Sequence, residues 1–232
     1  SIQLLKTLKI SSGVLSGDTR FDRVLKICSA PKQIDEISNF AKDSFVIVAG
    51  SSWKEDEDFL IEAYIHLKDK HSNLKLIIAP HEIDKKNIDR LKNLLHKYNL
   101  PFHLFSANSL AYTESILIIN AIGFLSSIYQ YGKVALIGGG FTNGIHNILE
   151  PTVYGLPVLF GPNYKKFNEA FEVIDLKVGV SVNNSDELIL QLTKWIENKK
   201  VLDETTQAAK QYVVNNSGAT QKIAKDLLNY LR

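Results

Sequence analysis

The sequence contains no methionine, a single cysteine and no long apolar run, and each shortage excludes a class of protein. Because Cys28 has no second cysteine to pair with, the chain holds no disulfide framework and no cysteine-based zinc site. No apolar stretch approaches the ~18 residues that a membrane-spanning helix needs, and the first residues lack the apolar core of a secretory signal. The missing start methionine leads us to expect a piece of a longer protein.

An excess of charge of one sign is also missing. The 232 residues include 27 Lys and Arg against 25 Asp and Glu, which gives a net charge of +2. A nucleic-acid-binding domain would show a clustered basic excess, so we expect no nucleic acid partner. The hydrophobic share of 45% is ordinary for a domain that buries a core. Without a repeat, low-complexity tract or linker to divide it, the chain is predicted to form one domain over residues 1–232.

Short apolar runs alternate with helix-like segments along most of the chain. Runs that are apolar at every position are typical of a parallel sheet with helices on both faces. The expected strands span residues 45–49, 74–79, 116–119, 134–137 and 157–160. The expected helices span residues 55–70, 84–98, 147–154, 166–175, 185–198, 201–214 and 218–231, and the last three make the C-terminal third helical. This order predicts a Rossmann-like α/β fold.

The most informative stretch follows the strand expected at 134–137. Gly138, Gly139 and Gly140 leave space in which a ligand can approach the backbone. Pro151 is tolerated only in the first turn of a helix, so this helix is expected to begin near Asn147, a natural N-cap. A helix N-terminus that faces a glycine loop stabilises a bound phosphate. The stretch fits neither the dinucleotide fingerprint nor the P-loop.

Two other polar groups near the expected strand ends each have a functional and a structural interpretation. Glu150 either complements the helix dipole or accepts hydrogen bonds from a ribose diol, and its place beside the glycine loop favours the diol. The turn at Ser51 and Ser52 either binds a phosphate or caps a helix. The acidic run at residues 54–58 is expected to be a solvated first helical turn.

In these segments the chain resembles the 3-deoxy-D-manno-octulosonate (Kdo) transferases, which have the GT-B fold. The matching segments are residues 16–24, 50–53, 77–80, 138–139, 146–151 and 155–162. The resemblance implies that the chain is the C-terminal, donor-binding domain of such an enzyme, with residues 1–20 as the interdomain segment. It implies no cofactor and places no catalytic residue in this domain.

The resemblance also assigns a binding site for the donor, CMP-Kdo. The residues of this site would be Ser51, Ser52, Ile122, Gly123, Gly138, Gly139, Gly140, His146, Asn147 and Glu150. Within this set the glycines and serines would contact the phosphate and Glu150 would hold the ribose. The backbone of Ile122 and Gly123 would line the cytosine pocket.

For the parent enzyme, the resemblance implies transfer of Kdo to the lipid A precursor in lipopolysaccharide biosynthesis. The acceptor surface, the catalytic carboxylate and all membrane association would belong to an N-terminal domain missing from this chain. The parent would act at the cytoplasmic face of the inner membrane of a Gram-negative bacterium. The domain by itself is expected to be soluble and inactive.

The chain departs from the family pattern at His81 and Glu82, where the family commonly has Arg-His. Neither residue has companions at metal-ligand spacing, and the helix N-terminus would carry the leaving phosphate, so we predict no metal site. Two alternatives stay open. One is the donor domain of another GT-B glycosyltransferase that uses a UDP-sugar, and the other is a non-catalytic nucleotide-binding module.

Overall fold

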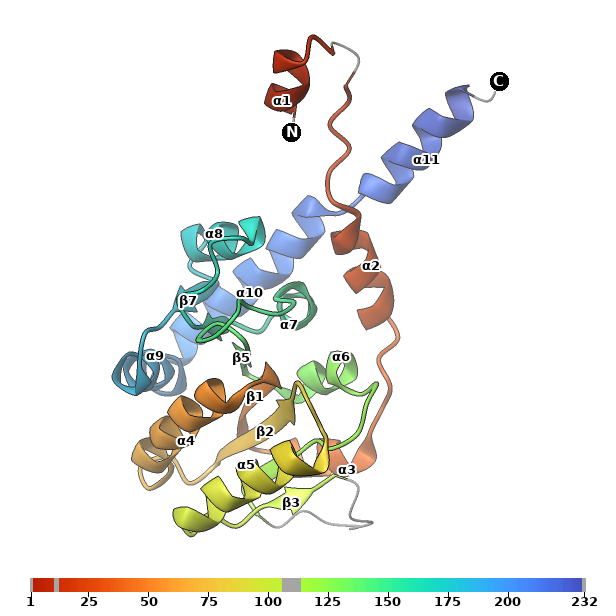
Figure 1. The fold of residues 1–232 in the computed structure, drawn as a ribbon. Helices are drawn as coiled ribbons and strands as arrows, with labels where there is room; N and C mark the ends of the chain where they lie inside the picture. Colours follow the sequence, from red (N-terminus) through yellow and green to blue (C-terminus); the bar gives the residue numbers. More distant parts are fainter. Residues whose placement is uncertain (1, 11–12, 106–113, 231–232) are drawn as a thin grey trace.

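The protein is built on a seven-stranded sheet in which every neighbouring pair of strands runs parallel (Figure 1). A computed structural model describes residues 2–10, 13–105 and 114–230. The strands lie in the order β3-β4-β2-β1-β5-β6-β7. Their bounds are β1 (Phe45–Ser52), β2 (Leu74–Pro80), β3 (His103–Leu104), β4 (Ile116–Ile118), β5 (Val134–Ile137), β6 (Val158–Phe160) and β7 (Gly179–Ser181). The predicted Rossmann-like α/β fold is confirmed.

Helices cover both faces of the sheet. They are α1 (Ile2–Thr7), α2 (Thr19–Cys28), α3 (Asp35–Ala41), α4 (Lys54–Lys68), α5 (Lys85–Lys97), α6 (Leu125–Ile128), α7 (Leu149–Val153), α8 (Asn168–Asp175), α9 (Ser185–Glu197), α10 (Lys199–Asn216) and α11 (Ala219–Tyr230). A short 3-10 turn at Tyr129–Tyr131 follows α6. Each helix expected from the sequence is present within about two residues of its expected ends, and the helical C-terminal third is confirmed.

Alternate residues of each strand enter one of two hydrophobic cores, one on each face of the sheet. In β1, Val46 and Val48 pack on the face covered by α2, α3, α7, α8 and α10. Their neighbours Phe45, Ile47 and Ala49 pack on the opposite face, under α4, α5 and α9. Successive strand side chains point to opposite faces, so a strand covered on both sides must be apolar throughout. The continuous apolar runs in the sequence follow from this burial.

The strand order reverses at β1. The chain runs outward from β1 to β2 on one side, then returns to place β5 on the other side of β1. In open parallel sheets, ligands bind beyond the carboxyl ends of the strands at such a switch point. The segments at this edge are the end of β1 at Ser51 and Ser52 with the following Trp53, and the glycine run after β5. The fold therefore gathers the sequence-predicted loops at the edge where a ligand site is expected.

Helix α2 was not among the expected elements, because its sequence fell at the end of the presumed interdomain segment. Asp18 caps it by accepting a hydrogen bond of 2.8 Å from the backbone N–H of Arg20. Phe21, Val24 and Cys28 recur on one face of the helix and are buried. Residues just beyond position 18 are therefore part of the domain itself. The strands β3 and β7 were also missed, since runs of two and three residues are too short to stand out.

Asp22 joins α2 to the beginning of α11. Its carboxylate accepts hydrogen bonds from the backbone N–H groups of Gly218 at 2.6 Å and Thr220 at 2.8 Å, and from the Thr220 hydroxyl at 2.8 Å. The bond from Gly218 is the main reason that the pKa of Asp22 lies below its usual value. Gly218 has φ +98°, a left-handed conformation that lets the chain turn from α10 into α11.

Helices α1 and α11 extend beyond the body of the domain (Figure 1). Apolar side chains on both stay exposed, among them Leu4 and Leu8 on the α1 side and Leu227 and Leu228 on α11. Within the described parts of the chain, no helix combines the length and the apolar character required to cross a membrane.

Two leucines of α9 offer a matched test of the core. Leu192 is fully buried, whereas Leu190 is 74% exposed on the same helix. We expect Leu192→Ala to lower the free energy of unfolding by about 2–5 kcal/mol, because it leaves a cavity under the sheet. Leu190→Ala should change it by less than about 0.5 kcal/mol. Urea unfolding followed by circular dichroism measures both, and equal losses would contradict the placement of α9.

Candidate functional site

The three glycines after β5 are all buried. A Cβ on Gly138 would overlap the carbonyl oxygen of Ser51, and one on Gly140 would overlap the backbone nitrogen of Gly161. Gly139 has φ +86° and lies against the carbonyl oxygen of Gly144. The glycines therefore allow backbone segments of the protein itself to approach closely. The position that a Cβ would take at each glycine is filled by protein backbone, and a ligand contact of these glycines stays a prediction.

Asp56 ties the glycine loop to the turn after β1. One oxygen of its carboxylate accepts hydrogen bonds of 2.8 Å from the backbone N–H groups of Trp53 and Gly139. The side chain is completely buried, and burial raises the pKa of the carboxyl group above its usual value, while the bond from Gly139 acts in the opposite direction. The two loops at the switch point are thus fastened to one another.

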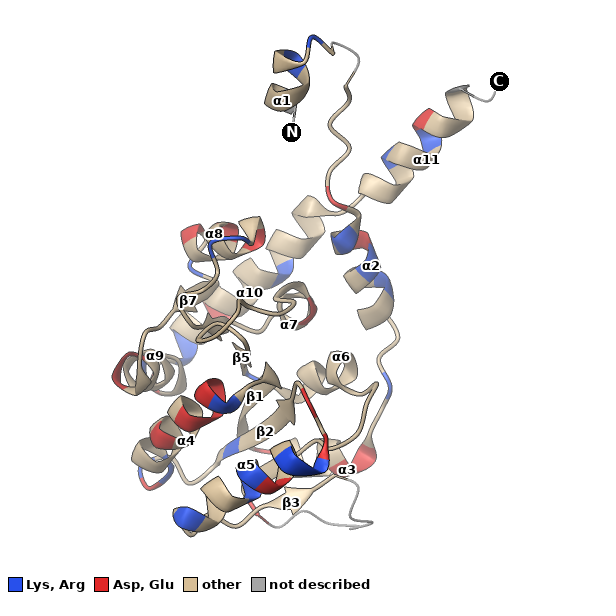
Figure 2. Ribbon diagram, viewed as in Figure 1, with Lys and Arg blue, Asp and Glu red and all other residues tan. Residues whose placement is uncertain are grey.

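The prediction that residues 54–58 form a solvated turn is wrong for the two central residues. Figure 2 shows acidic residues gathered in the first turn of α4, yet Asp56 and Glu57 are both fully buried. Glu57 pairs with Arg90 of α5 and accepts a hydrogen bond of 2.9 Å from the Ser52 hydroxyl. Residues 56–58 have Asp-x-Asp spacing, but Asp56 is occupied by backbone N–H groups. Within the described ranges, no group of three or more His, Cys, Asp or Glu could hold a metal ion.

Ser51 and Ser52, the last two residues of β1, differ in their surroundings. Ser52 is buried, and its hydroxyl donates to Glu57 rather than facing a cavity. Ser51 is half-buried and has φ +52°, which is an uncommon left-handed conformation for a residue with a side chain. Of the two, only Ser51 is placed where a ligand could reach its side chain.

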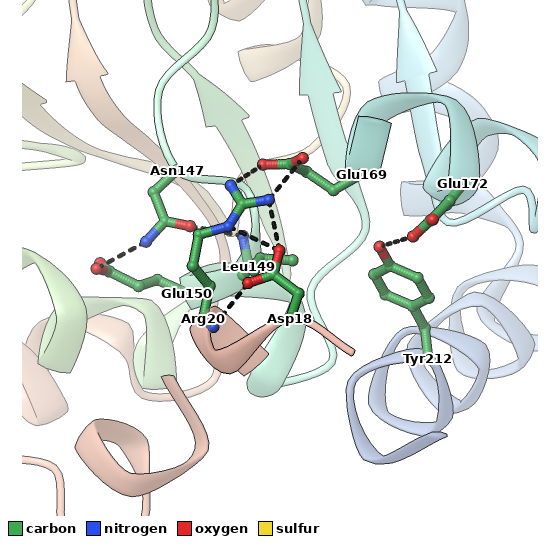
Figure 3. A network of polar contacts seen from close by, with 8 residues as sticks. All are labelled: Asp18, Arg20, Asn147, Leu149, Glu150, Glu169, Glu172 and Tyr212. Carbon is green, nitrogen blue, oxygen red and sulfur yellow. Dashed lines mark hydrogen bonds and ion pairs between the residues drawn. The ribbon is translucent and has the colours of Figure 1, made fainter. Parts of the chain in front are cut away.

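A cavity of about 350 Å³ lies at the start of α7. Its walls come from α2, from the loop before α7 and from the beginning of α8, and the polar side chains that line it are Arg20, Arg23, His146, Asn147, Glu150 and Glu169. Asn147 accepts a hydrogen bond of 3.0 Å from the backbone N–H of Leu149 and donates one of 3.0 Å to Glu150 (Figure 3). Helix α7 begins at Leu149 with Ile148 at its N-cap position, so the N-cap predicted at Asn147 lies one residue too early, although Asn147 bonds the first helical N–H.

Glu150 is half-buried at this cavity. Burial raises the pKa of its carboxyl group, and the hydrogen bond from Asn147 and the nearby Arg23 oppose that rise. The amide of Asn147 fixes one carboxylate oxygen, Oε1, while no contact to Oε2 is present among the described residues. The side chain is therefore oriented and retains capacity to accept hydrogen bonds from a ligand.

Arg20 reaches across from α2 to the same cavity. Its guanidinium donates to Glu169 of α8 at 2.6 Å and 3.2 Å, and to Asp18 at 2.9 Å (Figure 3). Arg23 lies one turn further along α2, is exposed and lines the cavity. Because Arg20 is already paired with two carboxylates, Arg23 is the cation on this wall that suits an anionic ligand. Neither arginine was singled out from the sequence, because the burial of α2 against the domain was not predicted.

Ile122 and Gly123 lie in an exposed turn after β4. Ile122 is 86% exposed, and Gly123 has φ +86° with open space around it. Neither is among the described residues that line the cavity at α7. The structure therefore brings His146, Asn147 and Glu150 together but leaves this turn apart from them.

Three aromatic rings stack where β1, β2 and β5 end. The ring centres of Trp53 and His81 are 4.7 Å apart, and those of His81 and His146 are 4.4 Å apart. The indole Nε1–H of Trp53 donates a 3.1 Å hydrogen bond to Nε2 of His146. Trp53 and His81 come shortly after expected strands, whereas His146 lies at the far end of the loop that follows residues 134–137, so the parallel topology could have grouped only the first two.

The chain matches the family model of group 1 glycosyl transferases over residues 31–212. Among curated proteins it is similar to the 3-deoxy-D-manno-octulosonic acid transferase of Aquifex aeolicus, with 33% identity over 156 residues. That match covers 66% of this chain and 42% of the Aquifex enzyme. The chain spans about half or less of the length of the first curated relatives it matches.

Among solved structures, the chain is similar to the C-terminal CMP-Kdo binding domain of WaaA from Acinetobacter baumannii. The TM-score is 0.68 at 19% identity, over 84% of this chain and 97% of that domain. It is also similar to MnaA of S. aureus in a co-structure with UDP, with a TM-score of 0.65 at 15% identity over 98% of this chain and 57% of MnaA. At these identities the likenesses show a shared fold.

Replacing Asp56 by asparagine tests whether its carboxylate fastens the two loops. An amide keeps one acceptor oxygen but loses the charge that strengthens both backbone hydrogen bonds, so we expect Asp56→Asn to lower the free energy of unfolding by about 1–3 kcal/mol. Asp58→Asn is the matched control, because Asp58 forms a surface ion pair with Lys54 and no other polar contact among the described residues. It should cost less than about 0.5 kcal/mol in urea unfolding. Similar losses in the two variants would argue against the fastening role.

Proposed function

Since this chain belongs to the group 1 glycosyl transferases, we propose that it is the donor-binding domain of an enzyme that transfers Kdo from CMP-Kdo to the lipid A precursor. The proposal extends to this chain the activity named for its relative from Aquifex aeolicus and the ligand named for the domain from Acinetobacter baumannii. It treats residues 1–232 as one donor-binding domain, with the segment before α2 as the connection to the rest of the parent enzyme.

The observation that carries the proposal is the pairing of Asn147 with Glu150 at the wall of a cavity that two arginines border. A carboxylate with accessible acceptor capacity suits a ribose diol, which offers two hydroxyl donors. The donor carries a phosphate and a sugar carboxylate, and Arg23 supplies positive charge on the wall formed by α2, where Arg20 is already paired with Asp18 and Glu169. A cavity of about 350 Å³ lies within the range that small ligands occupy in proteins.

The glycines take an indirect part in this proposal. The N–H of Gly138 donates to Gly50 at 2.9 Å and that of Gly139 donates to Asp56, so both are already occupied. We assign the three glycines the role of positioning His146 and α7. We place the phosphate near Ser51, Arg20 and Arg23. The turn at Ile122 and Gly123 would meet the base only if it moves toward the cavity. Ser52, whose hydroxyl is held by Glu57, would act through the backbone alone.

The remaining parts of the reaction belong to the rest of the parent enzyme. We propose that a second domain supplies the catalytic carboxylate, the acceptor surface and the membrane contact, at the cytoplasmic face of the inner membrane of a Gram-negative bacterium. This chain would then bind the donor weakly and catalyse no transfer alone, because the acceptor hydroxyl has no base to remove its proton. No cofactor is needed for this transfer.

A donor domain for a UDP-sugar is the second candidate, and the shared fold with MnaA in its complex with UDP favours including it. A non-catalytic nucleotide-binding module would share the same cavity. A titration that compares CMP with UDP separates the first two candidates, and preference for UDP would remove the Kdo assignment.

Glu150→Gln tests the diol contact. The amide keeps the shape of the side chain but replaces one acceptor by a donor, so we expect the affinity for CMP to fall by about tenfold or more, measured by isothermal titration calorimetry. The melting temperature should change little. Glu62→Gln, on an exposed face of α4, is the matched control and should bind CMP like the parent chain. Unchanged affinity in Glu150→Gln would reduce Glu150 to a partner of the helix dipole.

A further inference from the structure

The ring of His146 is held from two sides at the edge of the donor cavity. Its backbone N–H donates to the carbonyl of Gly138 at 3.1 Å, which fixes it to the glycine loop. Its side chain stacks on His81 and receives the hydrogen bond from Trp53 at 3.1 Å. Trp53 is itself fixed, because its backbone N–H is bonded to Asp56. The hydrogen bonds of Asp56, which join the turn after β1 to the glycine loop, therefore also fix the positions of the Trp53 and His146 side chains.

The direction of the bond from Trp53 determines where the proton of His146 resides. An indole nitrogen can only donate, so the Nε2 atom that faces it must be an acceptor and carry no proton. A neutral imidazole with a bare Nε2 carries its single proton on Nδ1. Protonating Nε2 would set two N–H groups against each other. Burial of the ring and the neighbouring His81 also lower the pKa of His146, which favours the same neutral form.

We propose that Trp53 is a positioning residue that holds His146 as the neutral Nδ1–H tautomer, so that His146 presents one fixed hydrogen-bond donor to the anionic group of a ligand in the donor cavity. This inference rests on the proposed function for the identity of the ligand. Nδ1 cannot reach Trp53 while Nε2 is bonded to it, and His146 lines the cavity. Among the described contacts, none involves Nδ1, so its N–H is available for a hydrogen bond to a ligand.

The charges around His146 show what a neutral donor contributes. His81 from the end of β2 stacks on it, and Arg20, Arg23, Glu150 and Glu169 face the same cavity from α2, α7 and α8. An unconstrained histidine changes charge near pH 6.5, inside the range in which enzymes work. A histidine held neutral gives the site a donor whose strength stays constant across that range. Arg23 supplies positive charge to the same cavity, whereas the charge of Arg20 is matched by Asp18 and Glu169.

Trp53→Phe removes the indole N–H and keeps an aromatic ring to stack on His81. The first measurement needs no ligand: the ring nitrogens of ¹⁵N-labelled His146 are observed by NMR, with His146→Gln used to assign them. We expect the Nδ1–H signature in the parent chain and a shift toward the Nε2–H form in Trp53→Phe. A proton on Nε2 in the parent chain would overturn the proposal, and this spectrum decides the tautomer even if the variant folds poorly.

The second measurement compares CMP affinity in the parent chain and in Trp53→Phe from pH 6 to pH 8. We expect binding about fivefold weaker in the variant at pH 8, where the wrong tautomer offers no donor. The difference should shrink below about pH 6.5, because a protonated ring donates from both nitrogens. The titration of the phosphate itself cancels in the ratio of the two dissociation constants, since the ligand is the same.

His146→Asn supplies the matched background. Its amide nitrogen can donate from a place near that of Nδ1 and has no tautomer, so adding Trp53→Phe to it should leave CMP affinity unchanged. If Trp53→Phe weakens binding equally in both backgrounds, the tryptophan acts by another route and the proposal fails. If the tautomer shifts without any change in CMP affinity, the positioning role is overturned although CMP still binds. If the parent chain binds neither CMP nor UDP, the donor assignment fails, whereas the ligand-free spectrum still decides the tautomer of His146.

Discussion

The buried carboxylate of Asp56 is the contact on which this end of the sheet depends. It accepts hydrogen bonds from backbone N–H groups on both sides of the switch point, one in the turn after β1 and one in the loop after β5. Taking a carboxylate out of water is costly unless such donors compensate it. Because both donors are backbone groups, the carboxylate fixes the paths of two loops together. The positions of Trp53 and His146, and through them the orientation of the cavity wall, follow from that one pair of bonds.

The glycine run predicts that some group approaches the backbone closely, but it does not predict which group this is. The sequence indicates that something approaches the backbone too closely for a Cβ, and this is true of all three glycines. What approaches is protein backbone from Ser51, Gly144 and Gly161. The accessible groups lie a few residues further on, where Asn147 and Glu150 reach the cavity. The loop therefore contributes by shaping its surroundings.

Much of the fold could be predicted from the sequence, because each long strand is covered on both faces and is apolar throughout. The strands β3 and β7 carry too few residues to give such a pattern. The burial of Asp56 and Glu57 could not be predicted from the local sequence, since their partners Gly139 and Arg90 lie 83 and 33 residues away. In the site, the start of a helix close to Asn147 was predictable from Pro151, although the N-cap position is Ile148. The ring stack required three strand ends to converge, and Arg20 required α2 to be recognised as part of the domain.

The bonds that Asp22 makes to Gly218 and Thr220 connect parts of the chain almost 200 residues apart in sequence. Helix α2 also carries Arg20 and Arg23 into the cavity. The beginning of the C-terminal helix is therefore bonded directly to the helix that forms one wall of the cavity, so residues near both ends of the described chain help to hold that wall in place.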